Sequence, residues 1–381
     1  MKKLKIKSFL LSTALLSSIF VCSTAIAETN EDKPSTISTT LPLEGHVVKA
    51  NDSNIQYVGR VRMLQGGIAS FNFPGTVIQA RFNGTSLKML CRPKTGYFMA
   101  QIDGAQPFKV AFNGERDSVV NLASALTDKA HDVRLMYIIE GLFRKPEFKG
   151  FILDDGANLL KPAPLKERRI EFIGNSITCG YGVESTNAPD PFEDETENHY
   201  LTYANIVSDS LNALHTSISR SGIGVYRNYD GPKDGSEENM PWQYGYTLFN
   251  DHSEEWNFSK YQPQLVCINL GTNDFSTNNY DAKHYEQNYR MFLATVRSKY
   301  PEAKIVLVTG PMLGEKENNI EKGILDRICK DFNKKDKEIY RFDFSFQTGD
   351  LGYGASWHPS KKQHEKMASE MLPYLRKLMN W

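Results

Sequence analysis

Four segments that lie far apart in the chain carry residue types suited to nucleophilic chemistry. Ser176 sits just after an apolar run, and His358 lies 182 positions further on. A serine hydroxyl becomes a good nucleophile when a neighbouring base takes its proton, and histidine suits that role near neutral pH. Backbone N–H groups at Ser176 and Gly222, together with the side-chain amide of Asn273, would stabilise an oxyanion, each contributing about 3 kcal/mol. This combination predicts acyl-transfer chemistry.

Each segment also has a purely structural interpretation. The Gly-Asn-Ser sequence around Ser176 could be a simple turn, and the Gly-Thr-Asn-Asp sequence around Asn273 could cap a helix, since Asn and Asp favour that position. His358, which precedes a proline, could be a surface histidine ahead of the last helix. The elements that carry the segments decide between these interpretations.

The second half of the chain alternates strand-like and helical patterns. Strands are predicted at residues 169–173, 215–219, 265–270, 304–309 and 339–344, and helices at residues 200–214, 281–298, 320–333 and 360–379. Such alternation predicts an α/β fold with a doubly wound parallel sheet. In these sheets ligands bind outside the carboxyl ends of the strands. Ser176, Gly222 and Asn273 each follow a predicted strand, so we expect them to meet His358 at one edge.

The first half of the chain has a different sequence pattern. From about residue 43 to residue 155, short runs rich in Val, Ile, Phe and Tyr are separated by turn signals such as Asn83-Gly84, Asp103-Gly104 and Asn113-Gly114. This pattern predicts an all-β sandwich, jelly-roll-like in type. We place the β-sandwich domain at residues 43–160 and, after a Pro- and charge-rich connector, the α/β domain at residues 168–381.

The first residues are interpreted as a targeting segment. Four lysines precede an apolar run, and Ala25-Ile26-Ala27 fits a small-x-small cleavage site. We therefore expect a signal peptide at residues 1–27, a flexible leader at residues 28–42, and export to the periplasm or the exterior. A lipoprotein at Cys22 is not favoured, because Phe20-Val21 lacks the small residues that such processing requires.

Composition excludes several classes of partner. Loss of the four leader lysines would leave 41 basic against 45 acidic residues, with no basic stripe, so neither nucleic acid nor an anionic membrane is an expected partner. The remaining cysteines form no CxxC pair, and HExxH and P-loop motifs are absent from the sequence. The acidic loop at residues 190–197 lacks the spacing of an EF-hand and is interpreted as solvated. We expect no metal, no cofactor and a monomer.

The segments "FIGNSITCGYG", "SRSGIGV", "NLGTND" and "WHPS" resemble, in order and spacing, the four blocks of the SGNH (GDSL-type) esterases, over about residues 168–381. The preceding β-sandwich, with "YVGR" near Tyr57, makes the chain most similar to family 2 of the carbohydrate esterases. The resemblance implies a secreted deacetylase acting on O-acetyl groups of polysaccharides such as xylan or glucomannan. Carried over by position, Ser176 is the nucleophile, His358 the base, and Gly222 and Asn273 join Ser176 in the oxyanion hole.

Two positions depart from the family pattern. Asn175 replaces the usual aspartate, and we expect activity to survive because Asn keeps a hydrogen-bond acceptor. Ala355 stands where an acid would orient the imidazole. We therefore predict a Ser–His dyad, with a backbone carbonyl holding the ring, and disfavour Asp343 and Asp350 as substitutes.

A long aromatic insertion at residues 226–251 is a candidate for substrate contacts, because flat rings pack against sugar faces. Tyr226 and Trp242 from this insertion, with Trp357 beside the proposed base, are the candidate cleft residues. For Tyr226 or Trp242 taken singly, packing of the loop onto the domain is the favoured interpretation, and Trp357 is the exception because it neighbours His358. Two other functions stay open: a lipase or general short-acyl esterase, and a glycan-binding protein whose site no longer turns over. For the β-sandwich we favour a supporting role.

Overall fold

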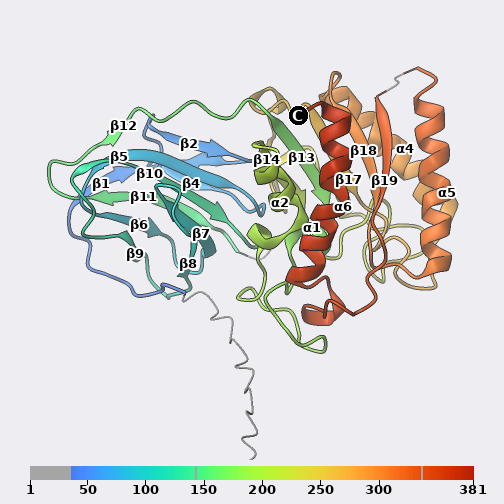
Figure 1. Ribbon diagram of the computed structural model, residues 1–381, viewed down its shortest axis with the longest axis horizontal. Coiled ribbons are helices and arrows are strands. Elements are labelled where there is room, and N and C mark those ends of the chain that lie inside the picture. Colours follow the sequence, from blue (N-terminus) through green and yellow to red (C-terminus); the bar gives the residue numbers. More distant parts are fainter. Residues whose placement is uncertain (1–35, 142–143, 336–337) are drawn as a thin grey trace, which may run out of the picture. The chain divides into compact units, whose positions relative to one another are not determined.

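The computed structural model describes residues 36–141, 144–335 and 338–381, which all lie in one compact unit (Figure 1). The predicted signal peptide at residues 1–27 and most of the predicted leader lie outside the described residues. No helix among the described residues is long and apolar enough to span a bilayer.

The N-terminal half forms two six-stranded antiparallel sheets. The first runs β3-β4-β11-β6-β9, with β1 paired to β11: β1 (His46–Lys49), β3 (Arg62–Leu64), β4 (Ile68–Ser70), β6 (Leu87–Cys91), β9 (Ser118–Ala123) and β11 (Glu147–Leu153). The second runs β12-β5-β10-β7-β8, with β2 paired to β5: β2 (Ile55–Val58), β5 (Val77–Gly84), β7 (Gly96–Ile102), β8 (Phe108–Phe112), β10 (Lys129–Tyr137) and β12 (Leu159–Leu160).

Period-two burial explains the sandwich. Along β5 and β6, buried side chains alternate with partly exposed ones, as a strand with one face in a core requires. Phe82 and Leu135 from one sheet share a single apolar core with Met89 and Phe151 from the other. The predicted all-β sandwich is confirmed.

The C-terminal half contains a five-stranded parallel sheet in the order β14-β13-β17-β18-β19. Its strands are β13 (Arg169–Gly174), β14 (Leu214–Ser219), β17 (Leu265–Asn269), β18 (Lys304–Thr309) and β19 (Ile339–Asp343). Its helices are α1 (Ser176–Cys179), α2 (Tyr203–Ser210), α3 (Met240–Gln243), α4 (Ala282–Lys299), α5 (Glu315–Phe332) and α6 (Lys361–Met379), and a hairpin is formed by β15 (Tyr246–Leu248) and β16 (Asp251–Glu255). Short 3-10 turns cover His199–Leu201, Phe258–Lys260 and Ala355–Trp357.

Helices cover both faces of this sheet (Figure 1). Apolar residues of α2 and α6, such as Val207 and Met371, pack with Phe172 on one face, whereas Leu293 of α4 and Leu325 of α5 pack with the core on the other. The predicted doubly wound α/β fold is confirmed. The strand order changes direction between β13 and β17, and the crevice outside such a switch point is where open α/β sheets bind ligands.

One predicted helix is wrong in extent. The pattern at residues 200–214 predicts a single helix, but the structure has a 3-10 turn followed by α2, which ends at Ser210. Thr202 between them is extended (ψ 160°), and Asn212 adopts φ +50°, a left-handed conformation that stops the helix. The chain can therefore enter β14 at Leu214.

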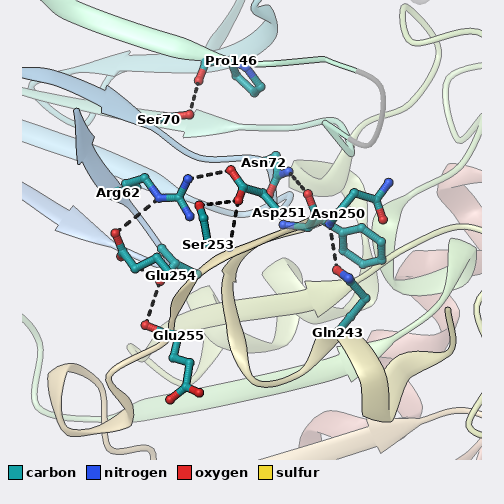
Figure 2. Close-up of polar contacts among 12 residues, drawn as sticks. Arg62, Ser70, Asn72, Pro146, Gln243, Asn250, Asp251, Ser253, Glu254 and Glu255 are labelled. Carbon is teal, nitrogen blue, oxygen red and sulfur yellow. Dashed lines mark hydrogen bonds and ion pairs between the residues drawn. The ribbon is translucent and has the colours of Figure 1, made fainter. Parts of the chain in front are cut away.

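The sandwich holds the hairpin of the α/β domain through polar side chains (Figure 2). Asn72 donates to the carbonyl of Phe249 at 2.9 Å and accepts from its N–H at 2.8 Å. Arg62 bonds Asp251 at 2.6 Å and Glu254 at 3.3 Å. The two predicted domains are thus joined by more than their connector.

Arg60, from the "YVGR" segment, is a second and more deeply buried link. Its guanidinium donates to the carbonyls of Tyr244 and Tyr246 at 2.6 Å each and is 1% exposed. Four aromatic rings surround it, with centroids 5.2–5.6 Å from its Cζ atom: Phe73, Tyr244, Trp256 and Phe258. Such stacking suits a delocalised cation removed from water.

Candidate active site

The nucleophile turn is built at the end of β13. Asn175 caps α1, because its side-chain oxygen accepts from the N–H of Ile177 at 3.1 Å, and Ser176 is the first helical residue. Gly174 packs so closely that a Cβ there would lie 2.1 Å from Oγ1 of Thr178. The sharp turn therefore needs glycine, and the expected acceptor role of Asn175 is what the structure shows.

The histidine reaches the serine from the other end of the domain's sequence. Nε2 of His358 lies 2.9 Å from Oγ of Ser176. Nδ1 of the same ring lies 3.1 Å from the carbonyl oxygen of Ala355 and 3.2 Å from that of Ser356. Because both of these partners can only accept, Nδ1 carries the proton, and Nε2 is left to accept the serine hydroxyl proton.

The backbone before His358 is strained. Ser356 has φ +48° and Trp357 has φ +57°, and two successive non-glycine residues in the left-handed region are costly. Hydrogen bonds to a distant loop hold them: Ser356 N donates to the carbonyl of Asp190 at 3.0 Å, and Trp357 N to that of Ala188 at 3.2 Å. The strain turns the carbonyls of residues 355 and 356 toward the imidazole.

The environment of His358 keeps the ring neutral. Tyr181 stacks on it with ring centroids 4.0 Å apart and an interplanar angle of 22°. Burial lowers the pKa of His358 to about 4, although the two carbonyl contacts act in the opposite direction. The imidazole is therefore an uncharged base at neutral pH.

The other two predicted oxyanion donors follow the strands on either side of β13. Gly222 follows β14 and adopts φ +76°, a conformation that favours glycine. Asn273 follows β17, is 6% exposed, and donates through Nδ2 to the carbonyl of Ile223 at 2.8 Å. This bond orients the amide and uses one of its two N–H groups.

Asp274 has a role that the sequence interpretation missed. Its buried carboxylate accepts from the N–H groups of Val225 at 3.0 Å, Tyr226 at 2.8 Å and Arg227 at 3.1 Å. Burial raises its pKa to about 6, against the lowering effect of these bonds. Asp274 thus fixes the segment that continues from Gly222. Its position directly after Asn273 in the sequence could have indicated that it lies near the site.

The predicted substrate-binding aromatics have different environments. Trp357 is 56% exposed beside the base, and Trp242 is 39% exposed, with its ring packed on His252. Tyr226 is 1% exposed and its hydroxyl accepts from the N–H of Asp281. It packs the core and cannot line an open cleft, so that assignment is wrong.

Tyr229 is a better candidate from the same insertion. It is 63% exposed, and its N–H donates to the carbonyl of Gly222 at 2.8 Å. The Asp230-Gly231 turn signal directly after it could have shown that this tyrosine, rather than Tyr226, lies at the surface.

The missing acid has no substitute among the described side chains at Nδ1 of His358. Ala355 is fully buried, and Gly182 opposite it could not accept a Cβ, which would lie 2.3 Å from Cβ of Ala355. Asp343 instead bonds Thr309 and Arg341, and Asp350 bonds Thr348. The two backbone carbonyls occupy the place of the acid.

One group among the described residues could offer three metal ligands. The carboxylates of Glu140 and Glu197 and the thiol of Cys179 place their ligand atoms within 4.8 Å of one another. Glu197 is fully buried, so the interpretation of residues 190–197 as a solvated loop is wrong at its last residue. Oε2 of Glu140 accepts the backbone N–H of Ser221.

A parallel α/β sheet that carries Ser176, His358 and amide donors at its carboxyl edge defines a serine hydrolase of the SGNH type. Residues 170–371 match the family model GDSL-like Lipase/Acylhydrolase, and residues 57–164 match Carbohydrate esterase 2 N-terminal. The chain belongs to carbohydrate esterase family 2, and it is a carboxylic ester hydrolase.

Named relatives agree with this assignment. A Cellulase/esterase CelE of Acetivibrio thermocellus is 34% identical over 87% of this chain, which spans 40% of that longer protein. An Acetylxylan esterase / glucomannan deacetylase of Cellvibrio japonicus is 26% identical over 88% of this chain and 92% of its own length. A family two carbohydrate esterase from Clostridium thermocellum, solved in complex with cellohexaose, superposes with a TM-score of 0.79 at 34% identity, over 86% of this chain and 99% of the other.

Proposed function

We propose that the protein removes O-acetyl groups from polysaccharides such as xylan or glucomannan, through a Ser176–His358 acyl-enzyme mechanism. The observation that carries the mechanism is the 2.9 Å contact between Oγ of Ser176 and Nε2 of His358, on an imidazole held by carbonyls. The named acetylxylan esterase / glucomannan deacetylase relatives support the substrate class.

In the first half-reaction, Ser176 passes its hydroxyl proton to Nε2 of His358 while Oγ attacks the acetyl carbonyl carbon. The oxyanion that forms is stabilised by the N–H groups of Ser176 and Gly222 and by the free N–H of Asn273. The imidazolium donates from Nδ1 to two carbonyl dipoles, which disperse its charge in place of a carboxylate.

Collapse of this intermediate breaks the ester C–O bond, and the departing sugar oxygen takes the proton from Nε2. Water then enters, gives a proton to Nε2 and attacks the acetyl-serine. Collapse of the second tetrahedral intermediate breaks the bond between Oγ of Ser176 and the acetyl carbon, releases acetate and returns the proton to Oγ. The exposed rings of Trp357 and Tyr229 offer flat surfaces on which a sugar ring can rest.

Acetate release from acetylated xylan, glucomannan and peptidoglycan, with Ser176→Ala as the control, tests the proposal. We expect release from the plant polysaccharides and loss of that release in the variant. A preference for long-chain over acetyl 4-nitrophenyl esters would instead favour a lipase. Polysaccharide binding without turnover would favour a glycan-binding protein.

We also propose that the protein is exported. The basic and apolar first residues and the Ala25-Ile26-Ala27 segment support this. Expression of the full chain in a bacterial host, followed by fractionation and N-terminal sequencing, should give a product outside the cytoplasm that begins after Ala27. A cytoplasmic, full-length product would contradict export.

A further inference from the structure

A carboxyl group from the sandwich domain reaches the oxyanion loop. Glu140, three residues beyond the end of β10, accepts the backbone N–H of Ser221 through Oε2 at 2.6 Å. Ser221 directly precedes Gly222, whose N–H is one of the proposed oxyanion donors. A single peptide unit therefore separates the Glu140 contact from the reacting oxygen's binding site.

The same carboxyl group also lies against the nucleophile helix. Sγ of Cys179, the last residue of α1, is 3.8 Å from Oε2 of Glu140 and 3.3 Å from Oγ of Ser219. Because α1 begins at Ser176, Glu140 contacts both the helix that carries the nucleophile and the loop that carries the donor. Its position can set the spacing between them.

Glu140 is itself held by another carboxyl group. Glu197 accepts the N–H of Glu140 at 2.9 Å through Oε2, while its buried Oε1 has no partner among the described residues. Burial raises the pKa of both carboxyl groups, because it removes their charged forms from water, and the negative charge of Glu140 raises the pKa of Glu197 further. The N–H of Ser221 nevertheless donates to Oε2 of Glu140, so this oxygen is an acceptor in the folded protein.

We propose that Glu140 is a positioning residue that places the N–H of Gly222 over Ser176, so that the sandwich domain completes the oxyanion hole. The proposal rests on the proposed Ser176 chemistry. Donor geometry must be held within about 0.5 Å for full effect. Loss of one oxyanion donor lowers kcat by about 10²–10³-fold, so a displaced donor should have a smaller but measurable effect.

The test compares Glu140→Ala with Glu140→Gln in the full chain, using 4-nitrophenyl acetate. In Glu140→Ala we expect kcat to fall about 10- to 100-fold, a fraction of the loss of a whole donor, while KM changes little. Glu140→Gln should retain most of the activity, since its side-chain carbonyl oxygen can still accept the N–H of Ser221. Glu115→Ala, which removes a carboxylate that is 81% exposed on the same domain, is the control.

If Glu140 has only a structural role, Glu140→Ala will have a lower melting temperature but an unchanged kcat per folded active site. That result would overturn the proposal. Equal losses in the Ala and Gln variants would also contradict it. If Glu140→Ala does not fold, Glu140→Asp decides: its carboxylate is one methylene shorter, so kcat should fall below that of Glu140→Gln. Activity on 4-nitrophenyl acetate without polysaccharide deacetylation would refute the proposed substrate but leave this test intact.

Discussion

The two halves of the candidate dyad are supported in opposite ways. Ser176 stands just after a buried strand, on a capped helix turn, two residues beyond Gly174. His358 stands on irregular backbone that includes two left-handed residues and is bonded to a loop about 170 positions earlier in the chain. The sheet positions the nucleophile, whereas loop-to-loop contacts position the base.

This difference shows how backbone carbonyls can contact the imidazole where the family pattern has an acid. The carbonyls of Ala355 and Ser356 orient the imidazole only because the strained backbone points them at Nδ1. Variants that remove the support of one member of the dyad test whether the other member is sufficient.

The largest effect is expected from removing either member of the dyad. Ser176→Ala and His358→Ala should each lower kcat for 4-nitrophenyl acetate by about 10⁴-fold or more, because neither group works without the other. The double variant should lose little beyond the single ones. Additive losses, measured by stopped-time assays, would show that the two residues do not act as a unit.

On the nucleophile side, Asn273→Ala should lower kcat by about 10²–10³-fold with little change in KM, because one oxyanion donor is lost. Asn273→Asp is the paired variant, since it keeps the size but replaces the donor by an acceptor. Steady-state kinetics should show both variants impaired. An Asp variant with wild-type kcat would exclude Asn273 from the oxyanion hole.

On the base side, Ala355→Asp restores the residue type of the family pattern and should not raise kcat. Ala355 is fully buried against Gly182, so an added carboxylate should destabilise the fold by about 3–5 kcal/mol, the cost typical of an uncompensated buried charge. Denaturant unfolding measures this loss, with Ala355→Ser as the small-residue control. A stable variant with higher kcat would show that the carbonyls are a poor replacement for an acid.

A smaller effect is expected from the ring that stacks on the base. Tyr181→Ala should expose His358, raise its pKa toward 6.5 and lower kcat near pH 5 by roughly 10-fold, whereas Tyr181→Phe should behave as wild type because the stack is kept. The matched pair separates the contribution of the ring from that of the hydroxyl, which makes a long 3.4 Å contact with Oγ of Ser356. Equal kinetics in the wild type, Tyr181→Ala and Tyr181→Phe would show that Tyr181 does not influence His358.

The position of Ser176 in the fold could be predicted from the sequence, because hydrophobic periodicity and turn residues specify the strand and the turn that carry it. Runs such as residues 304–309 predicted their strand to the residue, and the segments after them predicted which side chains share the sheet edge. The family resemblance and the α/β fold after a β-sandwich are confirmed, while the domain boundaries stay a prediction.

The surroundings of His358 were harder to predict from the sequence, because tertiary contacts hold this residue in place. Nothing local in the sequence shows that Tyr181 stacks on His358, or that Tyr226 turns inward while Tyr229 turns outward. Likewise, the buried carboxylate of Glu197 accepts the N–H of Glu140 from the other domain. Such contacts join segments that lie far apart in the sequence, and no periodic pattern in either segment indicates which residues it will contact.

Acid should also weaken the fold. The buried rings of His199 and His364 have pKa values lowered by burial to about 4 and about 3. Below pH 6.5 the unfolded chain binds protons that these folded residues do not, so stability falls as the pH drops toward 4. Circular dichroism at each pH should show this loss, and rates at acid pH should be taken only where the fold is retained.

The pH dependence of kcat/KM for 4-nitrophenyl acetate tests most directly whether a neutral, carbonyl-held imidazole activates Ser176. We predict activity that stays level from pH 8 to below pH 6 and falls only toward pH 4, where His358 gains a proton and can no longer act as a base. A midpoint at or above pH 6.5, in protein shown to be folded, would contradict it, because that is the behaviour of an exposed or carboxylate-paired histidine.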